Sequence, residues 1–183
     1  MARSSQTEMA VLGALSVEPM TGYALREAIR DVLGHFWSES FGQIYPTLND
    51  LEARGLVART GGARARSSTF AVTPDGARRL RELLGQPIQE VPPRNGLMLR
   101  LFFGRTLGVD ACRELIAATR ADAERRLREM DRLAAEVAGE PQYSADAPFW
   151  RLTIAAGRHT AEAAIAWADE SLAALDDMDR SPS

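Results

Sequence analysis

The chain has 183 residues, of which 45% are hydrophobic and 26% are charged, and its formal net charge is −3. A chain of this length and composition can bury a core and folds into one or two compact units. No apolar run approaches the roughly 20 residues that a helix needs to cross a bilayer, and no secretion signal is recognisable at the N-terminus. We therefore expect a cytoplasmic protein without a membrane partner.

Motifs for catalysis and for metal binding are absent from the sequence. It contains no lysine, hence no phosphate-binding loop that ends in Lys, and no Gly-x-Ser-x-Gly nucleophile motif. His35 and His159 are the only histidines, and neither has a second His or Cys at ligand spacing. The single Cys112 excludes an internal disulfide; it is either a redox thiol at a helix start or an ordinary small helical residue, the interpretation we favour. We expect neither an enzyme nor a bound metal or cofactor.

Two helices are predicted at the start of the chain, over residues 5–15 and 21–34. Met9 and Leu12 turn toward the core from the first helix, and Thr21 is the expected N-cap of the second. Three apolar residues at i, i+4 and i+7 form the predicted buried face of the second helix: Leu25, Ile29 and Val32.

A third helix is predicted to open at Phe41, with Ser40 as its N-cap, and to close at Gly55 as the C′ residue. The same spacing predicts its buried face: Ile44, Leu48 and Leu51. Pro46 lies inside this helix and removes one backbone hydrogen bond, so we expect a bend near Gly42.

Two short strands follow, over residues 56–60 and 67–72, around a glycine-containing turn. Between Arg54 and Arg81 there are seven arginines and one acid, Asp75, so this stretch has a net charge of +6. The seven arginines are Arg54, Arg59, Arg64, Arg66, Arg78, Arg79 and Arg81. A helix followed by a β-ribbon with an arginine-bearing loop is the order of elements in a DNA-binding winged helix.

A fourth helix is predicted from Pro74, with Thr73 as its N-cap, to about Leu84. Residues 86–96 contain three prolines and form the predicted linker. Charge marks the same boundary, because residues 1–85 hold ten arginines against nine acids, whereas residues 86–183 hold twelve against sixteen. The first part is therefore the one suited to a polyanion.

The second half is predicted to be helical: an apolar run over residues 97–103, a long helix from about residue 108, and a last helix from about residue 149. Four residues of the long helix recur every seven positions: Ile116, Ala123, Met130 and Val137. This heptad either packs on the last helix within one chain or also exchanges with helices of a second copy. We favour the second alternative, because recognition of a specific DNA site usually takes two winged helices on two half-sites.

Four segments resemble the PadR family of bacterial transcription regulators: GYAL at 22–25, GQIYPTL at 42–48, LEARGL at 51–56 and TPDG at 73–76. The resemblance covers residues 9–84 strongly and the remainder by its general layout. It implies a homodimer that represses transcription and leaves its operator when a phenolic acid or another planar, apolar compound binds. Two features depart from the family: Thr69 replaces a frequent aromatic residue on the second wing strand, and the wing loop carries only arginine as its cation.

The expected fold is mainly α with a small β-ribbon. Residues 1–85 form a winged helix-turn-helix DNA-binding domain, residues 86–96 a linker, and residues 97–183 an antiparallel helical dimerisation domain that can also sense an effector. The expected function is that of a dimeric, sequence-specific repressor. The alternative is a winged-helix protein-interaction module, which salt dependence of binding would distinguish from a DNA-binding protein.

Eight residues are predicted to contact a pseudo-palindromic DNA operator: Thr21, Tyr23, Ser40, Gln43, Tyr45, Thr47, Arg64 and Arg66. A Gln side chain pairs with adenine, and a Thr methyl contacts the methyl of thymine. Arginine binds phosphates or enters a narrow minor groove. For any single one of these arginines, a surface charge that contacts only solvent is an equally good interpretation. Tyr45 either donates its hydroxyl to a phosphate or packs beside Pro46.

Four residues of the second half are candidates for binding a small aromatic effector: Met98, Phe102, Trp150 and Trp167. Phe103 supplies a further aromatic surface in the same half. Aromatic residues at such spacing are also ordinary core residues, so an effector site between protomers is a hypothesis motivated by the two tryptophans.

Overall fold

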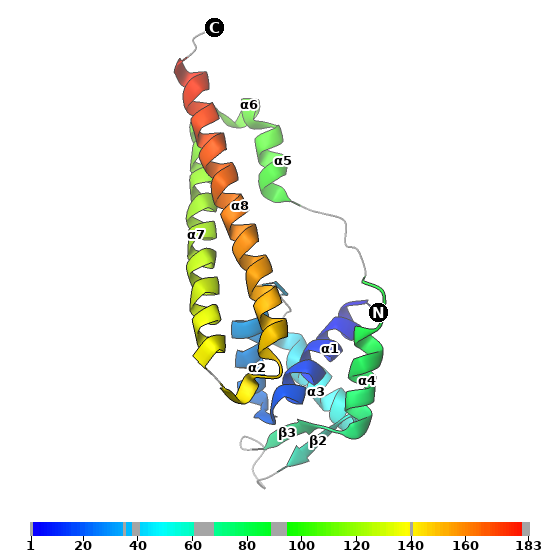
Figure 1. Ribbon diagram of the computed structural model, residues 1–183. Helices are drawn as coiled ribbons and strands as arrows, with labels where there is room; N and C mark the ends of the chain where they lie inside the picture. The colour runs from blue at the N-terminus through cyan, green and yellow to red at the C-terminus, as the bar shows by residue number, and fades with distance from the viewer. Residues whose placement is uncertain are drawn as a thin grey trace. The chain divides into compact units, whose positions relative to one another are not determined.

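The computed structural model describes residues 2–34, 36–37, 41–60, 68–88, 95–139 and 141–180. The chain divides into two compact units, Met1–Val91 and Pro92–Ser183. In Figure 1 the first unit runs from blue to green and the second from green to red.

Over its described residues, the first unit consists of four α-helices, a π-helical turn and three strands. The helices are α1 (Ala2–Val17), α2 (Gly22–Ala28), α3 (Phe41–Ala53) and α4 (Pro74–Leu84), with the π-helical turn η1 (Ile29–Leu33) after α2. The strands are β1 (Met20–Thr21), β2 (Val57–Thr60) and β3 (Thr69–Val72). The predicted winged helix-turn-helix is therefore confirmed.

The sheet has three antiparallel strands in the order β1-β3-β2. The predicted ribbon pairs Val57 with Val72 and Thr60 with Thr69, and β1 adds a third strand by pairing Met20 with Phe70. The sequence did not indicate β1, because a strand of two residues is too short to show an alternating pattern.

The core of the first unit contains the predicted buried faces of the helices, with one exception. Leu25 and Ile29 of the second helix are buried, but Val32 is 49% exposed. The prediction for Val32 was wrong because the helix widens into a π turn from Ile29 to Leu33, whose i→i+5 bonds change the spacing. Leu33 packs against the core instead.

The end of α3 is fixed by hydrogen bonds around Gly55, which has a φ of 71°. The Leu56 N–H donates to the Leu51 carbonyl at 2.9 Å, and the Gly55 N–H donates to the Glu52 carbonyl at 3.0 Å. This is the Schellman arrangement, in which a C′ glycine takes the left-handed conformation. The predicted end of α3 is confirmed, and the helix continues through Pro46.

The start of α4 is hydrogen-bonded to Gly55, the glycine that ends α3. The Thr73 hydroxyl accepts a hydrogen bond from the Gly76 N–H at 3.1 Å and donates one to the Gly55 carbonyl at 2.8 Å. Thr73 is thus the N-cap, as predicted, and Pro74 is the first helical residue.

The second unit contains a short arm, α5 (Gly96–Phe102) and α6 (Gly104–Leu107), and two long helices, α7 (Val109–Gly139) and α8 (Ala147–Arg180). The 3-10 turn η2 (Pro141–Tyr143) precedes α8. Asn95 caps α5 by accepting hydrogen bonds from the N–H groups of Leu97 and Met98. The helices α7 and α8 form an antiparallel hairpin (Figure 1).

The seam between α7 and α8 is built from small and medium apolar side chains. The buried residues of α7 are Cys112, Ile116, Ala123 and Met130, and those of α8 recur every seven positions: Ala147, Ile154, Ala161 and Ala168. Ile116, Ala123 and Met130 of the predicted heptad are thus buried within one chain by a second heptad on α8, and Val137 is half-buried. This packing within one chain is common to both alternatives given above. The heptad residues themselves give no evidence for a second copy.

Candidate nucleic-acid interface

The face of α3 opposite Ile44, Leu48 and Leu51 is available for contact. Gln43 is exposed, Tyr45 is 44% exposed and Thr47 is half-buried. Since a helix turns about 100° per residue, Gln43 and Thr47 lie on one flank of α3 and Tyr45 lies on the other.

Asn49 is exposed on the outward side of α3. It was missed as a candidate contact, although its position in the helical period and its amide, which can pair with adenine, provided the signal.

Tyr45 rests against the start of α2. A Cβ atom at Gly22 would lie 3.0 Å from Cε1 of Tyr45, so the absence of a side chain at Gly22 makes room for the ring. The exposed part of Tyr45 remains free for a second contact, and the two roles considered for this residue are compatible with one another.

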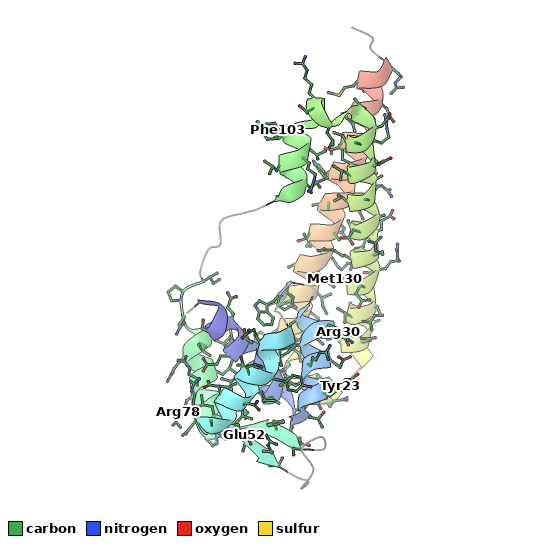
Figure 2. All side chains as sticks on the ribbon, turned by 180° about the vertical axis from the view of Figure 1, so that it is seen from behind. Tyr23, Arg30, Glu52, Arg78, Phe103 and Met130 are labelled. Atoms are coloured by element: carbon green, nitrogen blue, oxygen red, sulfur yellow. The ribbon has the colours of Figure 1, made fainter. Side chains whose placement is uncertain are left out.

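Thr21 and Tyr23 occupy the beginning of α2. The Thr21 hydroxyl accepts a hydrogen bond from the Ala24 N–H at 3.1 Å, so Thr21 acts as the predicted N-cap. Tyr23 is 65% exposed and is labelled on α2 in Figure 2. The other three candidates, Ser40, Arg64 and Arg66, lie outside the described residues.

Acids from elsewhere in the fold neutralise much of the positive charge counted between Arg54 and Arg81. Arg54 and Arg79 both bind Glu8 of α1, at 3.0 and 2.9 Å. Arg54 also binds Asp50 at 2.9 Å. The count of +6 therefore overstates the local charge, because a count along the sequence omits acids that the fold brings close.

The base of the wing holds a further ion pair. Arg59 of β2 binds Glu52 of α3 at 2.8 Å, and its guanidinium lies 4.9 Å from the centre of the Phe70 ring on β3. The hydrogen bond from Arg59 lowers the pKa of the Glu52 carboxyl. Arg78 pairs with Asp75 at 2.6 Å, whereas Arg81 is exposed and forms no ion pair within the described part of the chain.

The four effector candidates do not lie together within the second unit. Met98 (41% exposed) and Phe102 (84% exposed) are on α5, whereas the half-buried Trp150 and Trp167 are on α8. Trp150 packs on Tyr143 with ring centres 5.2 Å apart. Seventeen residues of helix separate the two tryptophans, about 25 Å at 1.5 Å per residue, so a small ligand cannot contact both within one protomer.

A groove of about 330 Å³ lies along α5 and α6, the arm that carries Phe103 in Figure 2. Its lining residues are Leu99, Arg100, Phe103, Thr106 and Leu107. None of the four effector candidates predicted from the sequence lines it, although it falls on the apolar run over residues 97–103.

Cys112 is buried in the α7–α8 hairpin, and its Sγ would lie 3.0 Å from a Cβ atom at Gly104. This close packing favours the interpretation of Cys112 as a small helical residue.

Within the ranges that the structure describes, no group of three or more His, Cys, Asp or Glu side chains could hold a metal ion. The helices described there are too short or too polar to cross a bilayer.

The α2–α3 pair followed by a β-ribbon and α4 defines a winged helix-turn-helix protein. Residues 11–82 match the transcriptional regulator PadR-like family, and residues 93–176 match the C-terminal part of the virulence activator alpha family. This match places residues 11–82 in the PadR-like family, which is a family of transcriptional regulators.

Two curated relatives match part of the chain. The negative transcriptional regulator PadR of Bacillus subtilis is 32% identical over 99 residues, which are 51% of this chain and 54% of that protein. An uncharacterized 37.1 kDa protein in a transposon of Streptomyces fradiae is 40% identical over 82 residues, 45% of this chain and 22% of that protein. The chain thus spans about half or less of the length of these relatives.

Solved structures share the fold along the whole chain. A PadR-like transcriptional regulator from Bacillus cereus has a TM-score of 0.80 at 20% identity and covers 94% of this chain and 99% of its own. Bacillus subtilis PadR has been solved with operator DNA and with p-coumaric acid, with TM-scores of 0.75 and 0.73 at 22% identity, and covers 92% of this chain and 98% of its own.

Proposed function

We propose that the protein is a dimeric, sequence-specific repressor that binds a pseudo-palindromic DNA operator in the bacterial cytoplasm. The observation that carries the proposal is the exposed face of α3 with Gln43 and Asn49, set beside the capped start of α2 in a PadR-like winged helix. The solved complex of Bacillus subtilis PadR with operator DNA supports the same use of this fold.

In this proposal α3 enters the major groove of the operator. Gln43 pairs with an adenine, and the methyl of Thr47 contacts a thymine. Tyr45 and Tyr23, on adjacent helices, contact the phosphate backbone, and Thr21 holds the start of α2 in place. Ser40 is a further proposed contact in the groove, and Arg64 and Arg66, from the segment between β2 and β3, are proposed to bind phosphates or the minor groove.

A second copy of the chain is proposed to cover the apolar surface of the second unit. Eight large apolar side chains of this unit are more than 40% exposed: Met98, Leu99, Phe102, Phe103, Leu107, Phe149, Leu152 and Met178. A monomer rarely exposes this much apolar surface, and such surfaces mark interfaces. The α7–α8 seam is already filled, so these residues are free to pack against another protomer.

We further propose that a small aromatic compound releases the repressor from its operator. The solved structure of Bacillus subtilis PadR with p-coumaric acid supports this proposal. Because Trp150 and Trp167 are too far apart within one protomer, the ligand binds beside one of them or between tryptophans of two protomers, with Met98 or Phe102 completing the site. Titration of p-coumaric acid into the Trp150→Phe and Trp167→Phe variants, followed by tryptophan emission, identifies which tryptophan responds. A flat response of the unmodified protein to a panel of phenolic acids would remove the effector from the proposal.

The experiment that tests the proposed function is selection of fragments of the host's genomic DNA by the purified protein at near-physiological salt. We expect enrichment of a two-fold-symmetric site whose half-sites are one helical turn, or a multiple of it, apart. Absence of enrichment, with binding that disappears as salt rises, would favour the protein-interaction module instead.

The contact of Gln43 with a base is tested by the Gln43→Ala variant on the selected operator. We expect a loss of about 1–3 kcal/mol in binding free energy and relaxed specificity at one position of each half-site. Gln86→Ala removes the same side chain from an exposed position after α4 and serves as the matched control. Equal affinities of the two variants would remove Gln43 from the interface.

A further inference from the structure

Glu8 is a nearly buried carboxylate that joins three helices of the first unit. Its side chain is 9% exposed, and it lies on α1, 46 residues before Arg54 and 71 residues before Arg79. Oε1 accepts hydrogen bonds from Nη2 of Arg54 at 3.0 Å and from Nε of Arg79 at 2.9 Å. Oε2 accepts a third from Nη2 of Arg79 at 3.3 Å.

These hydrogen bonds act on the two ends of the segment that carries the proposed DNA contacts. Arg54 directly follows α3, and Arg79 lies on α4, which directly follows the wing. Both oxygens of Glu8 are engaged, and the bond to Arg79 is bidentate, which fixes direction as well as distance. A movement of the carboxyl end of α3 or of α4 relative to α1 has to break at least one of these charged contacts.

We propose that Glu8 is a positioning residue for DNA recognition, which holds the carboxyl end of α3 and the middle of α4 against α1 through Arg54 and Arg79. This inference rests on the proposed DNA-binding function. Glu8 has a second effect in the same role: it neutralises two arginines that would otherwise attract phosphates without regard to sequence.

The test is the full-length Glu8→Gln variant, which preserves the shape of the side chain and removes its charge. We expect operator affinity to fall about tenfold while affinity for unrelated DNA is kept or raised, with a steeper dependence of non-specific binding on salt. Helical content and oligomeric state are measured on the same samples, below the melting temperature of the variant.

The matched control is Glu82→Gln. Glu82 is 64% exposed and binds Arg79 at 3.5 Å without contacting Arg54, so the change in net charge is the same. For each variant we compare affinity for the operator with affinity for unrelated DNA. If this ratio falls equally in both variants, the effect is due to net charge and the proposal is overturned. A lower melting temperature of Glu8→Gln with an unchanged ratio also overturns it, because Glu8 would then only stabilise the fold.

Hydrogen exchange separates this proposal from the proposed function. In the free protein we expect the amides of Leu51, Gly55 and Leu56 to lose protection in Glu8→Gln but not in Glu82→Gln. Unchanged protection overturns the positioning role whether or not an operator is found. If Glu8→Gln loses protection at these amides but the unmodified protein selects no operator, Glu8 still positions α3, and the DNA-binding function is refuted.

Discussion

At the scale of single residues, Gly76 is required by the close approach of two backbone segments. A Cβ atom at this position would collide with the carbonyl oxygen of Leu56, a backbone atom held in the corner between α3 and β2. The Gly76 N–H also donates to the Thr73 cap. The glycine of the TPDG segment is therefore a packing requirement, which the sequence motif alone did not explain.

The Gly76→Ala substitution is expected to destabilise the first unit by about 1–3 kcal/mol, because the carbonyl of Leu56 cannot move without disturbing the corner. Denaturant unfolding measures the change. Gly13→Ala is the control, because nothing lies within 4 Å of an added Cβ there and alanine favours the helix by about 0.5–1 kcal/mol. Equal effects of the two substitutions would contradict this account.

Glu8 also predicts a dependence of stability on pH. Burial raises the pKa of the Glu8 carboxyl, but the hydrogen bonds and charges of Arg79 and Arg54 together outweigh it, so the pKa is lowered from its ordinary value of 4.5. A lowered pKa in the folded state means that the stabilisation is complete above about pH 4.5 and is lost as the pH falls through the folded-state pKa.

The difference in unfolding free energy between the unmodified protein and Glu8→Gln is therefore expected to be largest near neutral pH and to shrink below pH 4.5. Denaturant titrations at a series of pH values measure it. A difference that stays constant down to pH 3 would show that the ionised carboxylate is not what stabilises this contact.

At the scale of elements, the α7–α8 hairpin combines an apolar seam with ion pairs along its edges. Arg113 pairs with Asp176 at 3.2 Å, and seven residues further along α7, Arg120 pairs with Asp169 at 2.6 Å, seven residues back along α8. Arg158 pairs with Asp131 in the same register at 3.2 Å. These charges agree with only one alignment of the two helices.

The Arg120→Asp and Asp169→Arg substitutions test that register. Each single change places like charges opposite one another and is expected to destabilise the hairpin only slightly, because both side chains are partly exposed to solvent. The double variant restores opposite charges and is expected to recover part of the loss. A double-mutant cycle from denaturant unfolding gives the coupling, and strict additivity would show that the pair does not contribute.

At the scale of the whole molecule, the proposed function requires two copies of the chain. Phe102→Arg places a charge in the most exposed large apolar residue of α5, so the proposed dimer is expected to dissociate and operator affinity to fall more than tenfold. Sedimentation and operator binding are the measurements. Ile88→Arg adds the same charge at a 95% exposed residue outside the second unit's apolar surface and is expected to remain dimeric. A dimeric Phe102→Arg variant would place the interface elsewhere.

The sequence by itself determined the local structure of this protein: the helices and their caps at Thr21 and Thr73, the Gly55 terminus and the wing strands. Each depends on side chains and glycines within a few residues of one another, as does the motif that indicates the family. The tertiary structure alone decided which acid each arginine meets, that β1 joins the wing, and that the α7 heptad packs within the chain. Those outcomes depend on contacts between residues far apart in sequence, as Glu8 and Arg79 show, and no local pattern contains them.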